Sequence, residues 1–284
     1  MRLSVVIPSR NRYENLRQVL SALFLQTLSK DEFEVIVSND NSTDGTGEIV
    51  FNYRDNLRLK YIFSNVPKPH TWNASIPRNL GASISDPSTT HLLFVDSDVV
   101  LPDFVLKNLV EDIERNPNRV IIGPYDFYAE GNEQIRTPDV RNLNFEVGID
   151  ETFDKPTDGL ACFGGNLLIP KDLFWKVGGF SPDIHIGLED GDMGLKLWKV
   201  GAMFSYDGRN RGKHLFHPTP TDRFPSDMKN HIDNLNLKHF HDKNPDYGIV
   251  EISREAYDKW GIGGWDPPPE WGKGKMDFML KINK

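Results

Sequence analysis

Short, mostly apolar runs alternate along the chain with segments whose apolar residues recur at helical spacing. The runs 3–7, 33–37 and 59–63 have the length and composition of strands, and the strand at 33–37 is expected to be buried. Between them, residues 16–24 and 46–53 place their apolar side chains on one side of a helix. This order of strand, helix, strand, helix and strand is typical of a doubly wound α/β fold with a mostly parallel central sheet.

The alternation continues through most of the chain, with one interruption. Residues 130–159 lose all periodicity, and we expect a long surface loop there. The further expected elements are strands at 92–95, 120–123, 164–170 and 202–206, and helices at 78–82, 104–115, 171–175, 189–200 and 227–241. We therefore expect one domain over residues 1–245, with halves at 1–102 and 103–245, and a C-terminal extension over 246–284.

The apolar run at 92–95 leads directly into two aspartates, Asp96 and Asp98, at the expected carboxyl end of a strand. Residues two apart on an extended chain point the same way, so both carboxylates aim at one spot. Ligands bind at that edge of open α/β sheets. The two charges repel each other unless a divalent cation lies between them. A solvated Asp-Ser-Asp turn that caps the next helix is the alternative, and this stretch alone does not decide.

A second acidic cluster, Glu189, Asp190 and Asp192, opens a later helix. Acidic residues in a first turn favour the helix dipole, so capping alone is one explanation. Three acids in four positions exceed what capping requires, and a carboxylate at a helix start beside a pocket suits a general base. Further along the chain, His214 and His217 offer imidazoles, which favour Mn²⁺ over Ca²⁺ if they join carboxylates around a cation.

Charge and composition narrow the class of protein. The 284 residues carry a formal net charge of −8, which argues against a general nucleic-acid-binding protein. Cys162 is the single cysteine, so no internal disulfide is expected and a reducing compartment fits. We find no signal peptide and no apolar segment of the ~20 residues that a membrane span needs, so we expect a cytoplasmic protein. A peripheral membrane contact and a homodimer stay open.

Five motifs in order resemble those of the family-2 glycosyltransferases, which have the GT-A fold. Residues 5–11 look like the opening strand and loop of that family. Residues 37–44 look like its V-x-D-D-G-S-x-D loop, with Asn39 and Asn41 replacing Asp and Gly. Residues 77–81 are similar to its A-R-N-x-G motif, with Pro77 replacing Ala, and residues 96–98 are similar to its D-x-D motif. Residues 178–192 resemble the G-G-F…E-D-x-D segment that is shared with galactosyltransferases and polypeptide N-acetylgalactosaminyltransferases. The resemblance covers about residues 3–217.

The resemblance implies a role for each matching residue. The implied donor-binding residues are Pro8, Ser9, Arg10, Asp40, Arg78, Asp96 and Ser97. Asp98 and His217 are the implied ligands of Mn²⁺ or Mg²⁺, with His214 as the substitute for His217. Asp190 is the implied general base that deprotonates the acceptor hydroxyl, and Glu189 is the implied acceptor-binding residue.

The implied reaction moves a sugar from a nucleotide-sugar donor, with UDP as the expected nucleotide, to a hydroxyl of a carbohydrate or glycolipid acceptor in glycan or polysaccharide synthesis. No enzyme nucleophile is required, so inversion at C1 is expected, and retention as in the N-acetylgalactosaminyltransferases is the first alternative. A sugar-nucleotide nucleotidyltransferase is disfavoured because the loop at 8–11 has no glycine. A non-catalytic carbohydrate-binding subunit is disfavoured because both acidic clusters are present.

Overall fold

The computed structural model describes residues 2–64, 73–128, 134–135, 155–157, 162–184, 188–217, 239–240 and 242–244. Its strands are β1 Leu3–Ser9, β2 Phe33–Asn39, β3 Leu59–Phe63, β4 His91–Val95, β5 Val99–Val100, β6 Arg119–Ile122, β7 Tyr125–Tyr128, β8 Gln134–Ile135, β9 Lys155–Thr157, β10 Asn166–Pro170, β11 Met203–Tyr206 and β12 Gly212–His214. Its helices are α1 Tyr13–Phe24, α2 Thr46–Phe51, α3 Ser75–Ser83, α4 Val105–Arg115, α6 Lys171–Lys176, α7 Glu189–Lys199 and the 3₁₀ helix η2 Gly208–Asn210. Most of the helix expected at 227–241, and all of the extension at 246–284, lie outside the described residues.

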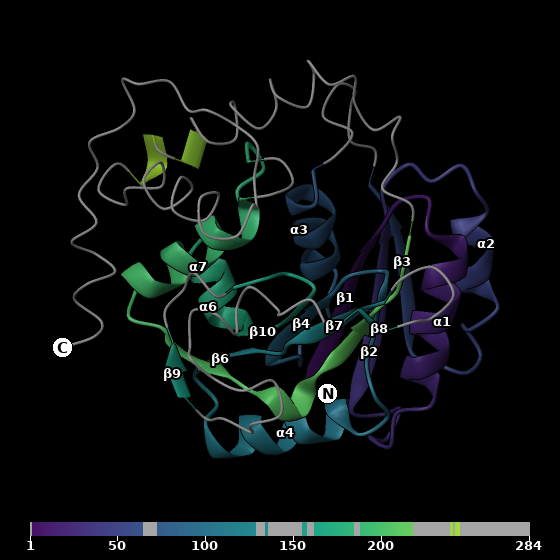
Figure 1. Ribbon diagram of the computed structural model, residues 1–284, viewed down its shortest axis with the longest axis horizontal. Helices are drawn as coiled ribbons and strands as arrows, with labels where there is room; N and C mark the ends of the chain where they lie inside the picture. The colour runs from purple at the N-terminus through teal and green to yellow at the C-terminus, as the bar shows by residue number, and fades with distance from the viewer. Residues whose placement is uncertain are drawn as a thin grey trace.

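One eight-stranded sheet runs through the protein in the order β3-β2-β1-β4-β10-β6-β11-β9 (Figure 1). The strands β3, β2, β1 and β4 pair in parallel, as do β6 and β11. In contrast, β10 runs antiparallel to both of its neighbours, and β9 runs antiparallel to β11. The prediction of an α/β fold with a mostly parallel central sheet is confirmed. Both expected halves of the chain contribute to this sheet, with β10 joining them.

The sheet separates two hydrophobic cores because successive side chains of a strand point to opposite faces. On β1, Val5 and Ile7 belong to one core and Val6 to the other. Helices α1, α2 and α4 contribute buried side chains to the first core, and α3, α6 and α7 contribute them to the second (Figure 1). The result is a three-layer arrangement in which the carboxyl ends of β1, β2 and β4 reach the same edge.

A second, four-stranded sheet in the order β5-β12-β7-β8 lies beyond the carboxyl end of β4. Its strand β12 pairs with β5, so that His214 stands opposite Val99. The backbone N–H of Leu215 then donates to the carbonyl oxygen of Asp98 at 2.7 Å. This small sheet therefore brings a histidine-bearing strand beside an aspartate that is more than a hundred residues earlier in the chain.

Local backbone signals end the helices where the sequence indicated. Gly178 follows α6 with φ +80°, and Gly201 follows α7 with φ +80°, a left-handed conformation that favours glycine. The expectation of a structureless loop at 130–159 was wrong at β8 and β9, and the rest of that segment lies outside the described residues. Within the described part of the chain, no helix combines the length and apolar character needed to cross a bilayer.

Candidate active site

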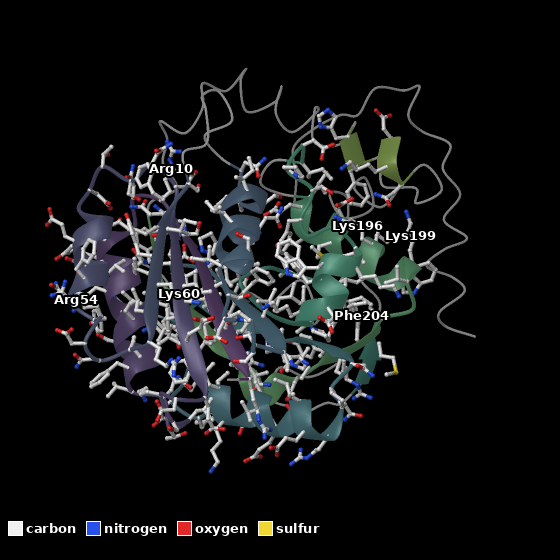
Figure 2. The ribbon with its side chains drawn as sticks, turned by 180° about the vertical axis from the view of Figure 1, so that it is seen from behind. Arg10, Arg54, Lys60, Lys196, Lys199 and Phe204 are labelled. Carbon is white, nitrogen blue, oxygen red and sulfur yellow. The ribbon has the colours of Figure 1, made fainter. Side chains whose placement is uncertain are left out.

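The loops that follow β1, β2 and β3 meet at the carboxyl edge of the sheet. Arg10 Nη1 lies 3.4 Å from the carboxylate of Asp40, and Ser64 Oγ donates to the other oxygen of Asp40 at 3.0 Å. Pro8 and Ser9 form the end of β1, and the Asp40 N–H donates to the Ser9 carbonyl oxygen at 2.8 Å. Figure 2 shows Arg10 at this end of the molecule. The structure thus brings four of the predicted donor-binding residues together.

Two asparagines in the second loop have structural reasons of their own. Asn39 is buried, and its amide donates to the Tyr61 hydroxyl at 2.6 Å while its carbonyl oxygen accepts from the Ser42 N–H at 3.0 Å. Asn41 has φ +55°, in the left-handed region that asparagine tolerates better than most residues. Its position is the one where the resembling motif has glycine. Both asparagines therefore have a local structural role at the positions where this loop departs from the motif.

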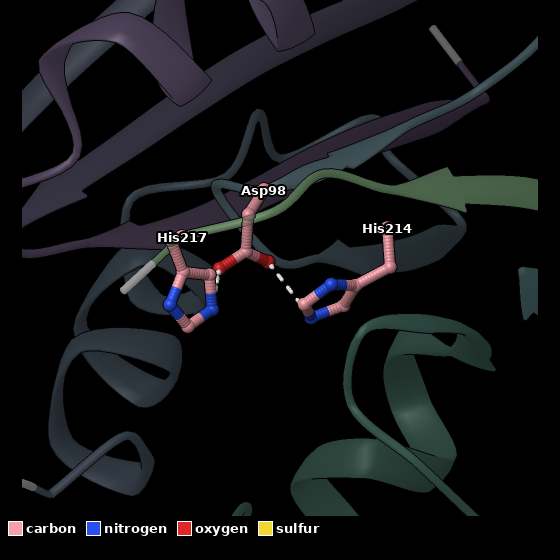
Figure 3. A group of neighbouring side chains, drawn as sticks. All are labelled: Asp98, His214 and His217. Carbon is pink, nitrogen blue, oxygen red and sulfur yellow. Dashed lines mark ion pairs between the residues drawn. The ribbon is translucent and has the colours of Figure 1, made fainter. Parts of the chain in front are cut away.

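Asp98 lies between the imidazole rings of His214 and His217 (Figure 3). Its Oδ1 is 3.6 Å from His214 Nε2, and its Oδ2 is 3.2 Å from His217 Nε2. The three side chains can offer ligand atoms that all lie within 4.8 Å of one another. One carboxylate and two imidazoles form a donor set that suits a transition metal. Both of the histidines that the sequence left as alternatives therefore lie at the same place.

The Asp98 carboxylate is held in its charged form. Burial on its own raises the pKa, but the hydrogen bond with His217 and the nearby His214 and Arg12 bring the pKa below its usual value. Among the described residues, Asp98 Oδ1 has no hydrogen-bond partner although it is buried. A charged oxygen with unused acceptor capacity is what a metal ligand offers, so the residues present fit a divalent cation.

Arg12 is a member of this site that the sequence analysis missed. Its guanidinium Nε is 3.6 Å from Asp98 Oδ2, and Nη2 is 3.2 Å from His217 Nδ1. The arginine side chain is only 13% exposed. In sequence, Arg12 is one polar residue in a polar loop, and only the return of the chain at residue 217 shows its neighbours.

Arg78 is a buried hub for three carboxylates. Its side chain is 3% exposed, with Nη2 2.9 Å from Asp96 and Nη1 3.1 Å from Glu189 and 3.2 Å from Asp190. The ring of Phe180 lies 5.2 Å from the guanidinium carbon. These contacts surround Arg78 with acids, and its predicted contact with the donor stays a prediction. One guanidinium thus joins the two acidic clusters, which the sequence places in different halves of the expected domain.

Asp190 has a pKa that suits proton transfer near neutral pH. Burial, together with the charges of Glu189 and Asp96, raises the pKa of Asp190 to about 7, although Arg78 and the Gly164 N–H oppose the shift. A carboxyl group whose pKa lies near the working pH is an effective general base. The side chain keeps 21% exposure, so a hydroxyl group can reach it.

Two adjacent glycines make this packing of charges feasible. A Cβ atom on Gly164 would lie 2.5 Å from the Arg78 guanidinium carbon and 2.7 Å from Asp190 Oδ1. A Cβ atom on Gly165 would lie 3.0 Å from Asp96 Oδ2. Any larger residue would therefore displace the hub. In the sequence this glycine pair indicates only the start of a strand, and its position directly before β10 was the available signal.

The geometric reason given for the first acidic cluster was wrong. The Val99 N–H donates to the Asp96 carbonyl oxygen at 3.0 Å, so residues 96–99 form a turn and not an extended strand. As a result, the two aspartates contact different groups: Asp96 contacts Arg78, and Asp98 contacts the histidines. Ser97 between them is buried. The turn alternative is correct for the backbone, while the carboxylates still take part in two charged clusters.

Helix α7, which carries Glu189 and Asp190, is held in place by residues on both sides of it in the sequence. Asp192 is 1% exposed and accepts hydrogen bonds from Ser181 Oγ at 2.5 Å and Asn244 Nδ2 at 3.4 Å. Lys199 on the same helix donates to Asn244 Oδ1 at 2.6 Å, and Figure 2 labels this lysine. The third acid of the cluster is therefore structural, and it anchors the helix that presents the other two.

This three-layer α/β domain, with charged loops at the carboxyl edge of its sheet, agrees with the predicted GT-A fold. A sequence model of the family described as Glycosyl transferase family 2 matches residues 4–178. This chain belongs to Glycosyl transferase family 2, and the family prediction is confirmed. The resemblance at E-D-x-D remains a prediction because the matched segment ends before it.

The relatives that are similar in sequence or structure are named as glycosyltransferases or match in fold. A validoxylamine A glucosyltransferase of Streptomyces hygroscopicus is 27% identical, with 91% of this chain and 68% of that enzyme aligned. The poly(ribitol-phosphate) β-N-acetylglucosaminyltransferase TarP of Staphylococcus aureus is 30% identical over 46% of this chain and 38% of its own. Among solved structures, S. aureus TarS 1–349 in complex with UDP matches with a TM-score of 0.64 at 19% identity, over 91% of this chain and 72% of that one.

Proposed function

We propose that this protein transfers a sugar from a UDP-sugar to a hydroxyl group of a carbohydrate or glycolipid acceptor, with metal dependence and inversion at C1. The single observation that carries the proposal is the meeting of both acidic clusters at Arg78, with Asp190 near pKa 7 beside Asp96. The names of the relatives, glucosyl and N-acetylglucosaminyl transferases, support sugar transfer. The UDP complex of TarS supports the choice of nucleotide.

On the donor side, the chain's own residues recognise the nucleotide. Asp40 accepts a hydrogen bond from the base, with Pro8, Ser9 and Arg10 around it at the ends of the first loops. Ser9 is buried, and its Oγ has no hydrogen-bond partner among the described residues, which leaves it able to bond a ligand. Asp96 faces the ribose next to its ion pair with Arg78.

Asp98 and His217 would hold a divalent cation, Mn²⁺ or Mg²⁺, and His214 belongs to the same cluster. When bound, this cation neutralises charge on the leaving diphosphate. These side chains are held at the carboxyl edge of the sheet by the ion pairs of Arg12 and Arg78, by the turn at Asp96 and by strand β12. Ser97 is buried within the turn between the two aspartates, and its predicted role is to contact the donor.

On the acceptor side, Asp190 takes the proton of the attacking hydroxyl as the new C–O bond forms at C1 and the bond to the diphosphate breaks. Such general-base assistance contributes roughly 10²–10⁴ in rate. Glu189 is nearly buried and ion-paired with Arg78, which supports a role in fixing the site as well as in holding the acceptor. A single displacement of this kind inverts the configuration at C1, and a product with retained configuration would move the protein to the alternative mechanism.

Two substitutions test the proposal separately. Asp98→Ala should abolish Mn²⁺-dependent thermal stabilisation by UDP, because ligand binding raises the melting temperature by mass action. Asp190→Asn should keep that stabilisation and lose transfer. A panel of nucleotide sugars, read by the same stabilisation, identifies the donor. If both variants retain turnover, this proposal is refuted. If the wild type binds sugars but neither transfers the sugar of the donor nor hydrolyses the donor, a non-catalytic carbohydrate-binding subunit is favoured.

We further propose that residues 1–245 form one glycosyltransferase domain and that 246–284 are an extension to it. The support is the continuous sheet, in which β1 to β4 and the later strands β6 and β11 are joined through β10. Limited proteolysis tests this division, because one domain should give one resistant fragment that ends near residue 245. Two resistant fragments separated near residue 102 would contradict it.

A further inference from the structure

The guanidinium of Arg12 contacts two of the residues that the proposed function assigns to a cation. Nε is 3.6 Å from Asp98 Oδ2, and Nη2 is 3.2 Å from His217 Nδ1. The backbone of Arg12 is fixed independently, because its N–H donates to Thr46 Oγ1 at 3.2 Å and its carbonyl oxygen accepts from the Leu16 N–H at 2.7 Å. The side chain can therefore change partners without any movement of the fold.

The contact with Arg12 decides which ring nitrogen of His217 carries the proton. A guanidinium has donors only, so Nδ1 of His217 must accept, and in the neutral ring the proton is then on Nε2. That Nε2–H faces Asp98 Oδ2 at 3.2 Å. A nitrogen that carries a proton has no lone pair for a metal. Ligation through Nε2 and the hydrogen bond from Arg12 to Nδ1 therefore exclude each other.

Charge points in the same direction. A divalent cation held by Asp98 would have the permanently positive guanidinium of Arg12 as a close neighbour, and like charges at such separations repel strongly in a partly buried site. The Arg12 side chain is 13% exposed, which limits screening by water. Once displaced from Asp98, a guanidinium on the donor side of the site has the planar set of donors that best matches phosphate oxygens.

We propose that Arg12 competes with the divalent cation for Asp98 and His217, and that the displaced guanidinium binds the diphosphate of the donor. This inference rests on the proposed function. Arg12 is then a positioning residue that couples the two ligands: the cation binds weakly alone, the nucleotide binds weakly alone, and each strengthens the other, since coupling between two sites is reciprocal.

The test uses the full chain and measures Mn²⁺ by loss of its free electron paramagnetic resonance signal, with and without UDP. In Arg12→Ala we expect Mn²⁺ alone to bind about tenfold more tightly, UDP with Mn²⁺ to bind about tenfold more weakly, and the coupling between the two ligands to weaken. Arg12→Lys keeps the charge, so its affinity for Mn²⁺ alone should stay within about threefold of wild type. Arg17→Ala is the matched control, because Arg17 lies on α1 and pairs only with Glu14 at the surface in the described contacts.

The outcomes separate this inference from the function on which it rests. If Asp98→Ala still binds Mn²⁺ and UDP as the wild type does, the proposed cation site is wrong. If Asp98→Ala loses that binding but Arg12→Ala binds Mn²⁺ alone no more tightly than Arg17→Ala, the competition is refuted and the cation site stands. An equal melting temperature of the Arg12 variants and wild type without ligands shows that the comparison is between folded proteins.

Discussion

Replacing Arg78 with methionine removes a positive charge that three carboxylates share and keeps most of the apolar stem of the side chain. The guanidinium lies 2.9 Å from Asp96, 3.1 Å from Glu189 and 3.2 Å from Asp190. Burial and the two neighbouring acids already raise the pKa of Asp190 to about 7, and Arg78 is the largest influence that opposes them. In the variant only the Gly164 N–H still opposes them, so the pKa of Asp190 should rise further.

The size of the effect follows from the burial of the hub. Arg78 is 3% exposed and Asp190 21%, so their interaction is only partly screened by water. Breaking a buried ion pair by removing one partner costs roughly 3–5 kcal/mol. A differential of about 1.4 kcal/mol between the two protonation states already shifts a pKa by one unit. We therefore expect the acidic limb of the rate profile to move from near pH 7 up to about pH 8 or higher.

The assay is kcat/KM for UDP release in the presence of acceptor, between about pH 5 and 9. Transfer should rise with pH in both proteins, because only the deprotonated Asp190 accepts a proton, but later in Arg78→Met. Arg78→Lys, which keeps one charge, should lie between them. Affinity for UDP is measured alongside. If the acidic limb stays in place while UDP affinity falls, Arg78 acts on the donor and the reasoning about Asp190 is refuted.

Three further outcomes are expected. The free energy of unfolding should fall as the pH rises from about 4 to about 7, because Asp190 keeps its proton in the folded protein at pH values above 3.8, the ordinary pKa of an aspartate. Asp190→Asn should flatten this slope in urea titrations, and an equal slope in the variant would contradict the prediction. Gly164→Ala should cost about 1–3 kcal/mol through overpacking, measured by thermal unfolding against the uncrowded Gly191→Ala. Asn244→Ala should cost about 1–3 kcal/mol by removing a partner of buried Asp192, and an unchanged melting temperature would refute that anchoring role.

Local patterns were enough for most of the fold. The mostly apolar runs at β1, β2 and β4 predict buried strands, and most of their apolar side chains face one of the two hydrophobic cores. Strand β3, at the edge of the sheet, is only partly buried. The spacing of Leu16, Leu20 and Leu23 predicts α1 because these side chains share one helix face. Acid-rich and glycine-bounded α7 was likewise predictable. Each of these signals depends only on residues close together in the sequence.

The direction of strand β10 and the contacts of Arg12 and Arg78 with residues far away in the sequence could not be predicted from local patterns. The run 166–170 is apolar whether its strand runs parallel or antiparallel, since both faces are buried in either case, so the reversal at β10 left no mark. Arg12 and Arg78 look like ordinary polar-loop and helix residues until the chain brings acids or histidines to them. The rule that residues two apart point together failed at Asp96 because it holds for strands and not for turns.

The anchoring of α7 by Asn244 has a consequence for how the protein is made. Asp192 gains this partner only after the ribosome has added 52 further residues. In a nascent chain the half of the domain proposed to bind the nucleotide can therefore form early. Helix α7, which carries the proposed general base Asp190, receives its last contact later. Premature termination before residue 244 would yield a molecule that is built to hold a donor but is poorly prepared to use it.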